Sequence, residues 1–76
     1  MNLIGVSMLD MATGQFDDAT IDFDRIIIMQ ERTHFFEFRY PHTKKENLDV
    51  THLRLGDNIS IYVKQTINQL KVRASA

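Results

Sequence analysis

Residues 33–45 read THFFEFRYPHTKK, a stretch in which four aromatic residues lie among two histidines and three basic residues. Side chains alternate between the two faces of a strand, so Phe36 and Phe38 share one face. Exposed rings on a sheet can stack single-stranded bases, but rings in a chain of 76 residues with no tryptophan are more often needed in the core. We therefore predict a core strand from Thr33 to Tyr40, ended by Pro41.

The remaining chain also favours strands, because apolar and polar residues recur with period two. We predict strands over residues 2–11 and 16–30, with a bend near Asp24 and Arg25 in the second and a turn at Glu31 and Arg32 after it. A hairpin is predicted over residues 58–75, in which one face is buried. Its buried side chains are predicted to be Ile59, Ile61, Val63, Leu70 and Val72.

One short helix is predicted between the third and fourth strands, within residues 43–56. Thr43 and Glu46 have the spacing of a capping box, Leu48 and Leu55 lie seven residues apart, and Gly56 can end the helix. The resulting fold class is mainly β: a small five-stranded antiparallel barrel or a strongly curled sheet, OB-like or SH3-like.

The length of 76 residues predicts a single domain, residues 1–76, with a thin core. The absence of cysteine excludes disulfides and thiol chemistry. The first residues lack a basic signal-peptide start, and no apolar run reaches the roughly 18 residues that span a bilayer. We therefore expect a cytoplasmic protein with no membrane partner.

Titratable residues show no arrangement typical of an enzyme. His34 and His42 are too far apart along an extended chain to share a metal ion, and His52 has no ligand partner at a helical spacing. Asp22 and Asp24 would lie on one side of a strand, but a chain of this size has little room for the deep cleft that acid–base catalysis needs. The sequence thus predicts no metal, no cofactor and no catalytic residue.

The apolar run Ile26–Met29 predicts an interface. Its four side chains cannot all face one core, because neighbours in a strand point to opposite sides. We assign Ile27 and Met29, or their neighbours if a bulge shifts the phase, to a contact with a second copy or another protein. The first functional hypothesis is therefore a non-enzymatic interaction or regulatory module that acts through protein–protein contacts as a homo-oligomer.

Charge supplies an alternative. Residues 1–38 have a net charge of −5 and residues 39–76 a net charge of +4, within a total of −1. Such a chain can present a basic face, which is what a single-stranded nucleic-acid-binding accessory protein with an OB-like barrel needs. The candidate residues are Arg39, Lys44, Lys45, Tyr62, Lys64, Lys71 and Arg73.

Overall fold

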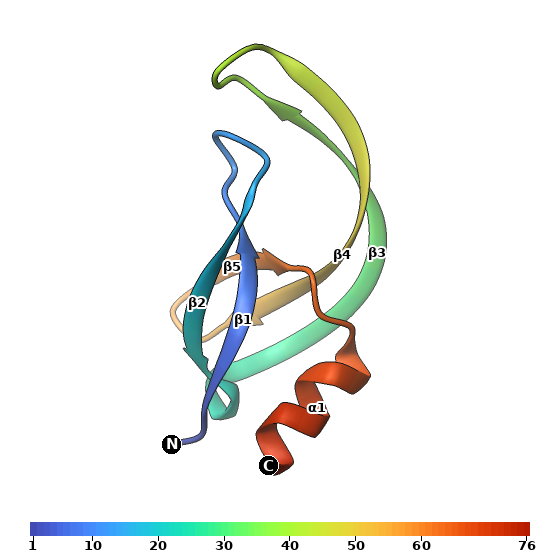
Figure 1. The fold of residues 1–76 in the computed structure, drawn as a ribbon. Helices are drawn as coiled ribbons and strands as arrows, with labels where there is room; N and C mark the ends of the chain where they lie inside the picture. Colours follow the sequence, from blue (N-terminus) through green and yellow to red (C-terminus); the bar gives the residue numbers. More distant parts are fainter.

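The computed structural model describes residues 1–76, which form one antiparallel sheet of five strands followed by a helix (Figure 1). The strands lie side by side in the order β2-β1-β5-β4-β3. No pairing joins β2 to β3, so the sheet is not closed into a barrel. The elements are β1 (Leu3–Leu9), β2 (Phe16–Asp22), the 3-10 helix η1 (Phe23–Arg25), β3 (Ile26–Phe38), β4 (Lys44–Leu55), β5 (Ile59–Val63) and α1 (Ile67–Ser75).

The turn between β1 and β2 requires a glycine. Asp10 holds this turn through its side chain, which accepts from Ala12 N at 2.8 Å, and through its carbonyl, which accepts from Gly14 N at 2.9 Å. Gly14 has a φ of 78°, and a Cβ atom there would lie 2.6 Å from Cδ2 of Phe38. The turn therefore packs closely against the end of β3 only because residue 14 has no side chain.

The predicted bend near Asp24 and Arg25 is confirmed, because η1 separates β2 from β3. The Asp22 carboxylate caps η1 by accepting from Asp24 N at 3.1 Å. The turn predicted at Glu31 and Arg32 is wrong, since β3 continues through both residues to Phe38. Each of them has a pairing partner on β4, and this ladder keeps the backbone extended.

The helix predicted within residues 43–56 is also wrong. This segment is β4, which pairs with β3 over its whole length and with β5 from Thr51 to Leu55. The capping-box spacing of Thr43 and Glu46 is a local preference, and the two ladders on either side of β4 outweigh it.

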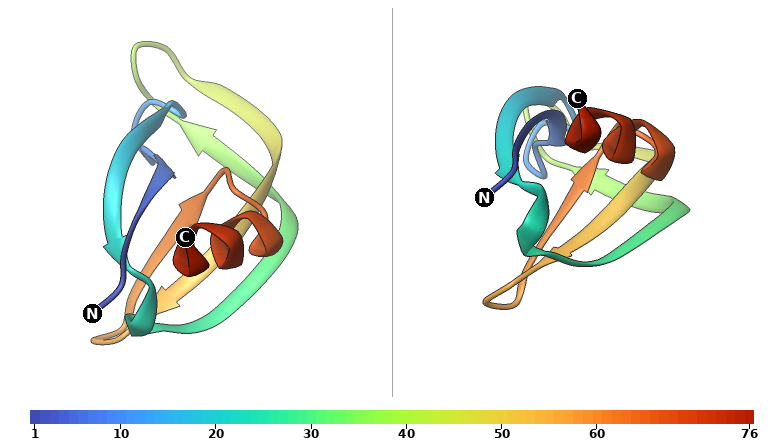
Figure 2. Two further views of the ribbon diagram at one scale, coloured as in Figure 1. Left: turned by 60° about the horizontal axis from the view of Figure 1, so that its bottom comes forward. Right: turned by 90° about the horizontal axis from the view of Figure 1, so that it is seen from below.

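The helix lies instead at the C-terminus, where a second hairpin strand was predicted. Thr66 and Gln69 form a capping box: Gln69 N donates to Thr66 Oγ1 at 3.2 Å, and Thr66 N donates to Gln69 Oε1 at 2.9 Å. Ile59, at the start of β5, was predicted to be buried but is 45% exposed. Leu70 is fully buried, whereas Val72 is 63% exposed. These two side chains cannot share a face because they are two residues apart on a helix. Figure 2 shows α1 lying against one side of the sheet.

The core is divided into two clusters. The larger contains Ile4, Val6, Ile21, Leu53, Val63 and Leu70, and the smaller contains Leu9, Phe36, Phe38 and Val50. In β4, Val50 and Thr51 are adjacent and both buried. Adjacent strand residues project to opposite faces, so the buried face of the sheet changes at this point. The lower half of the β3–β4 hairpin packs toward α1, and its upper half curves over the β1–β2 turn (Figure 1).

The prediction for the aromatic strand is confirmed in its main point. Phe36 and Phe38 are 3% and 0% exposed, whereas Phe35 on the opposite face is 56% exposed. Tyr40 lies beyond the end of β3 and is exposed. The rings of Phe36 and Phe38 therefore belong to the core and are not available for stacking on bases.

Candidate binding surfaces

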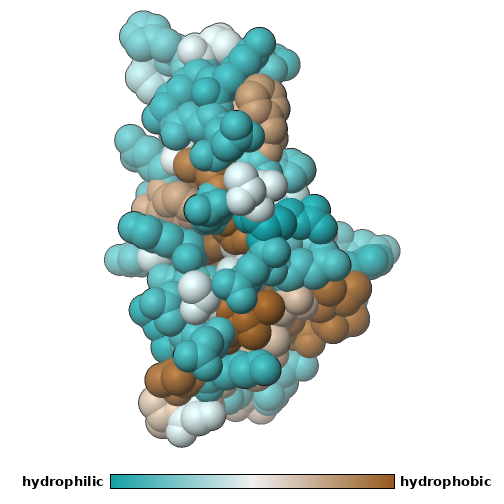
Figure 3. All heavy atoms as spheres, turned by 90° about the vertical axis from the view of Figure 1, so that its right-hand side faces the viewer, coloured by the Kyte–Doolittle hydropathy of each residue, from teal (hydrophilic) through white to brown (hydrophobic).

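The first candidate surface is the free edge of β3, called here the β3 edge. β3 spans 13 residues and pairs only with β4, so its other side has unpaired backbone groups. Ile27 is 66% exposed and Ile28 is 39% exposed at the start of this strand. Figure 3 views the side of the molecule on which β3 lies, where the largest hydrophobic areas are in the lower half.

The structure changes which residues of the run Ile26–Met29 are exposed. Ile26 and Met29 pack against the larger core cluster, so the assignment of Met29 to the outer face is wrong. The pairing register shifts between Ile26 and Ile28, and Ile27 has no Cα partner on β4. This bulge inserts one residue and changes the phase of the alternation, which leaves Ile27 and Ile28 outside.

The second candidate surface lies on the side of β3, β4 and β5 away from α1. Residues paired across an antiparallel ladder project to the same face. His52 of β4 pairs with Gln30 of β3 and with Tyr62 of β5, while Arg54 pairs with Ile28 and Ser60. We call this surface the histidine–tyrosine face and define it by Arg32, His34, His52, Arg54 and Tyr62.

Three half-buried rings form a row across this face. The Tyr62 ring centroid lies 5.6 Å from that of His34 and 5.2 Å from that of His52, with interplanar angles of 27° and 34°. Phe36, from the smaller core cluster, meets the Tyr62 ring edge-on at 5.0 Å. Phe36 lies beside the row on the same face and joins it to the smaller core cluster, which orders the rings before any ligand arrives.

Two arginines flank the rings without acidic partners. Arg32 donates to Gln30 Oε1 at 2.8 Å, and Arg54 donates to Asn58 Oδ1 at 3.0 Å. The three ion pairs of the molecule join other residues: Met1 to Asp24, Arg25 to Asp57, and Lys44 to Glu46. Neutral oxygen acceptors orient the two guanidinium groups and leave their charge uncompensated.

The pKa of His52 is affected by its burial and by these positive charges. Burial lowers its pKa, and the nearby positive groups Arg32, Arg54 and His34 lower it further. Its Nδ1 atom is buried and has no hydrogen-bond partner. Both effects favour the neutral imidazole, so a nearby negative charge is the change that would favour its protonation.

The other residues predicted to bind nucleic acid do not join this face, apart from Tyr62. Arg39 follows β3, Lys44 and Lys45 begin β4, and Lys71 and Arg73 lie on α1. Lys64 follows β5 and lines a hollow with Glu31, Asp49 and Arg32, the last of which also belongs to the histidine–tyrosine face. Lys64 and Arg73 share a second hollow, but the set as a whole is distributed over the molecule and forms no common site.

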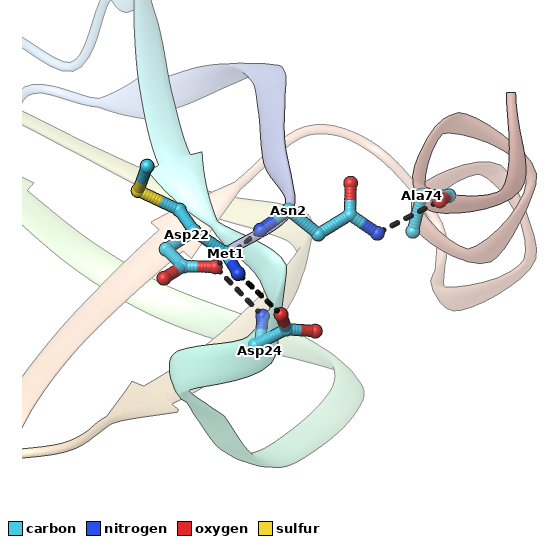
Figure 4. A network of polar contacts seen from close by, with 5 residues as sticks. All are labelled: Met1, Asn2, Asp22, Asp24 and Ala74. Carbon is cyan, nitrogen blue, oxygen red and sulfur yellow. Dashed lines mark hydrogen bonds and ion pairs between the residues drawn. The ribbon is translucent and has the colours of Figure 1, made fainter.

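The acidic residues near the N-terminus have a structural role (Figure 4). The Asp22 carboxylate accepts from Asn2 N at 3.0 Å, and this hydrogen bond is the main cause of its lowered pKa. Asp24 forms an ion pair with the terminal amine of Met1 at 3.4 Å. The Asn2 side chain donates to the carbonyl of Ala74 at 2.8 Å. This network joins β1, η1 and the end of α1.

Comparisons with protein-family models, curated proteins and solved structures found no match to this chain. No group of three histidine or acidic side chains comes together in a way that could hold a metal ion. None of the helices has the length and apolar character needed to cross a membrane.

Proposed function

We propose that this chain is a non-enzymatic interaction module that self-associates through the β3 edge. The observation that carries this proposal is the pair of exposed isoleucines, Ile27 and Ile28, at the start of a long strand with a free edge. Backbone groups that are unpaired along an edge are a template for another strand. β3 contains no proline and no lysine, two residues that commonly prevent edge pairing.

Most of the free energy gained from such a contact would come from the apolar residues at the start of β3. Burying a side chain of the size of Ile27 or Ile28 gains roughly 1.5–3 kcal/mol relative to full exposure. Ile27 is the more exposed of the two and therefore has more to gain. A symmetric dimer would bury Ile27 and Ile28 of each copy, and this gain helps to offset the entropy lost on association.

The accessible surface supports the same proposal. It is 5159 Å² for a chain of 8.9 kDa, and a compact monomer of this mass exposes about 4,800 Å². The excess follows from the elongated shape, with extents of 38 × 22 × 18 Å, and from a core that is split into two clusters. A partner that covers the β3 edge would reduce this excess surface.

A symmetric arrangement is available to a strand with a free edge. A two-fold axis perpendicular to the sheet near the middle of the strand would pair two β3 strands antiparallel. Glu31 and Arg32 are adjacent in the middle of β3 and both are exposed. Partners across such an axis project to the same face, so an axis at Glu31 or at Arg32 would set like charges opposite each other, and a register centred beside these two residues avoids this.

Sedimentation equilibrium tests the proposal with a charge-neutral pair of substitutions. Ile27→Glu/Ile28→Lys should convert the dimer to a monomer and preserve the circular dichroism spectrum. The control is Met11→Lys/Val72→Glu, which places the same charges at two exposed apolar residues of a turn and of α1. A parent that is monomeric at about 100 μM would contradict the proposal, as would equal dissociation of the control.

A further inference from the structure

We propose that the histidine–tyrosine face binds single-stranded nucleic acid, with phosphate groups at Arg32 and Arg54 and a base against the ring row centred on Tyr62. This site differs from the β3 edge in its chemistry, although Ile28 and Arg32 of β3 border both surfaces. It combines two features that such ligands require: positive charge that tracks a phosphate backbone and rings that contact bases.

The charge on this face is positive without compensation. Strand positions that project to it are every second residue: 28, 30, 32 and 34 of β3, 52 and 54 of β4, and 60 and 62 of β5. None of these positions is acidic, and two are arginine. The neighbouring acids Glu31 and Asp49 pair with Thr51 and Thr33 and project to the opposite face. A polyanion therefore meets no carboxylate at these positions; Glu46, further along the same face of β4, is paired with Lys44, and the nearest other acids are Glu31 and Asp49, which line a hollow with Arg32.

The spacing of the two arginines suits an extended ligand. Arg32 pairs with Val50 of β4, and Arg54 lies four residues further along that strand. At about 3.3 Å per residue the two residues are separated by roughly 13 Å along the strand direction. His52, which pairs with Tyr62, lies midway between residues 50 and 54, whereas His34 pairs with Leu48 and lies beyond Arg32. A ligand that contacts both arginines must therefore pass the His52 ring, beside Tyr62.

The rings favour a single strand over a duplex. Bases in a duplex are stacked on one another, and their π-faces are not accessible to a protein side chain. Tyr62 and the two histidines form a fixed ring row that can contact an unstacked base.

Fluorescence anisotropy with a labelled oligodeoxythymidylate of about 12 nucleotides measures this binding directly. Contacts to two phosphates of a single strand give a salt slope of about −1.4, so affinity should fall about sevenfold between about 50 and 200 mM salt. Arg32→Gln/Arg54→Gln should lower affinity at about 50 mM salt by about tenfold or more and abolish most of this slope. The matched control, Lys45→Gln/Lys71→Gln, removes the same charge from residues outside the face and should bind as the parent does.

Tyrosine emission tests the role of the rings. The chain has two tyrosines and no tryptophan, so Tyr40→Phe leaves Tyr62 as the only emitter. Oligonucleotide binding should then quench the remaining emission. Four results would overturn the proposal: no binding by the parent at about 50 mM salt, equal loss of binding in the control, equal affinity for a duplex of the same length, or unchanged Tyr62 emission on binding.

Discussion

Gln65 accepts from the Ser7 amide the hydrogen bond that a carbonyl of a neighbouring strand would otherwise accept, while the Ser7 carbonyl accepts from Lys64 N at 2.9 Å. The Ser7 amide donates to Gln65 Oε1 at 2.8 Å, and Gln65 Nε2 donates to Ser7 Oγ at 3.2 Å. β1 and β5 share a single register pair, Met8 with Val63, so the ladder between them is short. The buried Gln65 side chain extends this junction between the two hairpins.

Gln65→Leu should therefore destabilise the fold by about 1–3 kcal/mol, the cost of leaving a partly buried amide without an acceptor. Urea unfolding followed by circular dichroism measures the change. Asn68→Leu, an exposed position in the first turn of α1, is the control and should change stability by less than about 0.5 kcal/mol. A Gln65→Leu variant as stable as the parent would show that the short ladder holds the hairpins alone.

Phe38 and Phe35 form a matched pair of aromatic residues on opposite faces of β3. Phe38→Ala should cost about 3–5 kcal/mol, because Phe38 is fully buried in the smaller cluster. Phe35→Ala should have little effect, since this ring is more than half exposed. Thermal unfolding of both variants measures the difference. Similar melting temperatures for the two would contradict the assignment of the smaller core cluster to the Phe38 face of β3.

His52 predicts how stability depends on pH. Its pKa is lower in the folded protein than the value of about 6.5 in an unfolded chain. Folding thus favours the neutral form, and the unfolded state binds more protons between these two pKa values. The resulting stability is present above pH about 6.5 and is lost as the pH falls through the folded-state pKa.

Urea midpoints measured at several pH values test this dependence. His52→Gln should remove the loss of stability below pH about 6.5, whereas His42→Gln, which changes an exposed residue in the β3–β4 turn, should retain it. Parallel curves for the parent and His52→Gln would show that other groups cause the dependence.

The parts of the fold that were predicted correctly rest on local alternation. The strand that carries Phe36 and Phe38 and the bend after Asp22 were both evident, because side-chain period and turn residues act over a few neighbours. Lys44–Leu55 was misread because its capping-box spacing is also local, while its strand conformation depends on β3 and β5. For the C-terminus, the sequence did contain the signal: Thr66 and Gln69 have capping-box spacing, which the alternation of Leu70 and Val72 obscured.

The histidine–tyrosine face was missed because the secondary structure of β3 and β4 was predicted incorrectly. Arg32, His34, His52 and Arg54 were not grouped because one pair was assigned to a turn and a strand, and the other to a helix. Correct alternation along β3 and β4 would have placed all four on one face with Tyr62. The bulge between Ile26 and Ile28 is different, since neither residue type nor spacing indicates where the register shifts. That shift decides whether Met29 or Ile28 is exposed.

Amide hydrogen exchange along β3 tests the central claim, self-association through this strand, most directly. In an antiparallel strand successive amides alternate in direction, so the amides of β3 that do not point toward β4 are free in a monomer. We predict that these amides exchange slowly at about 500 μM protein and quickly at about 10 μM, because dilution dissociates the paired strands. Fast exchange of these amides at both concentrations would contradict the proposed β3 pairing.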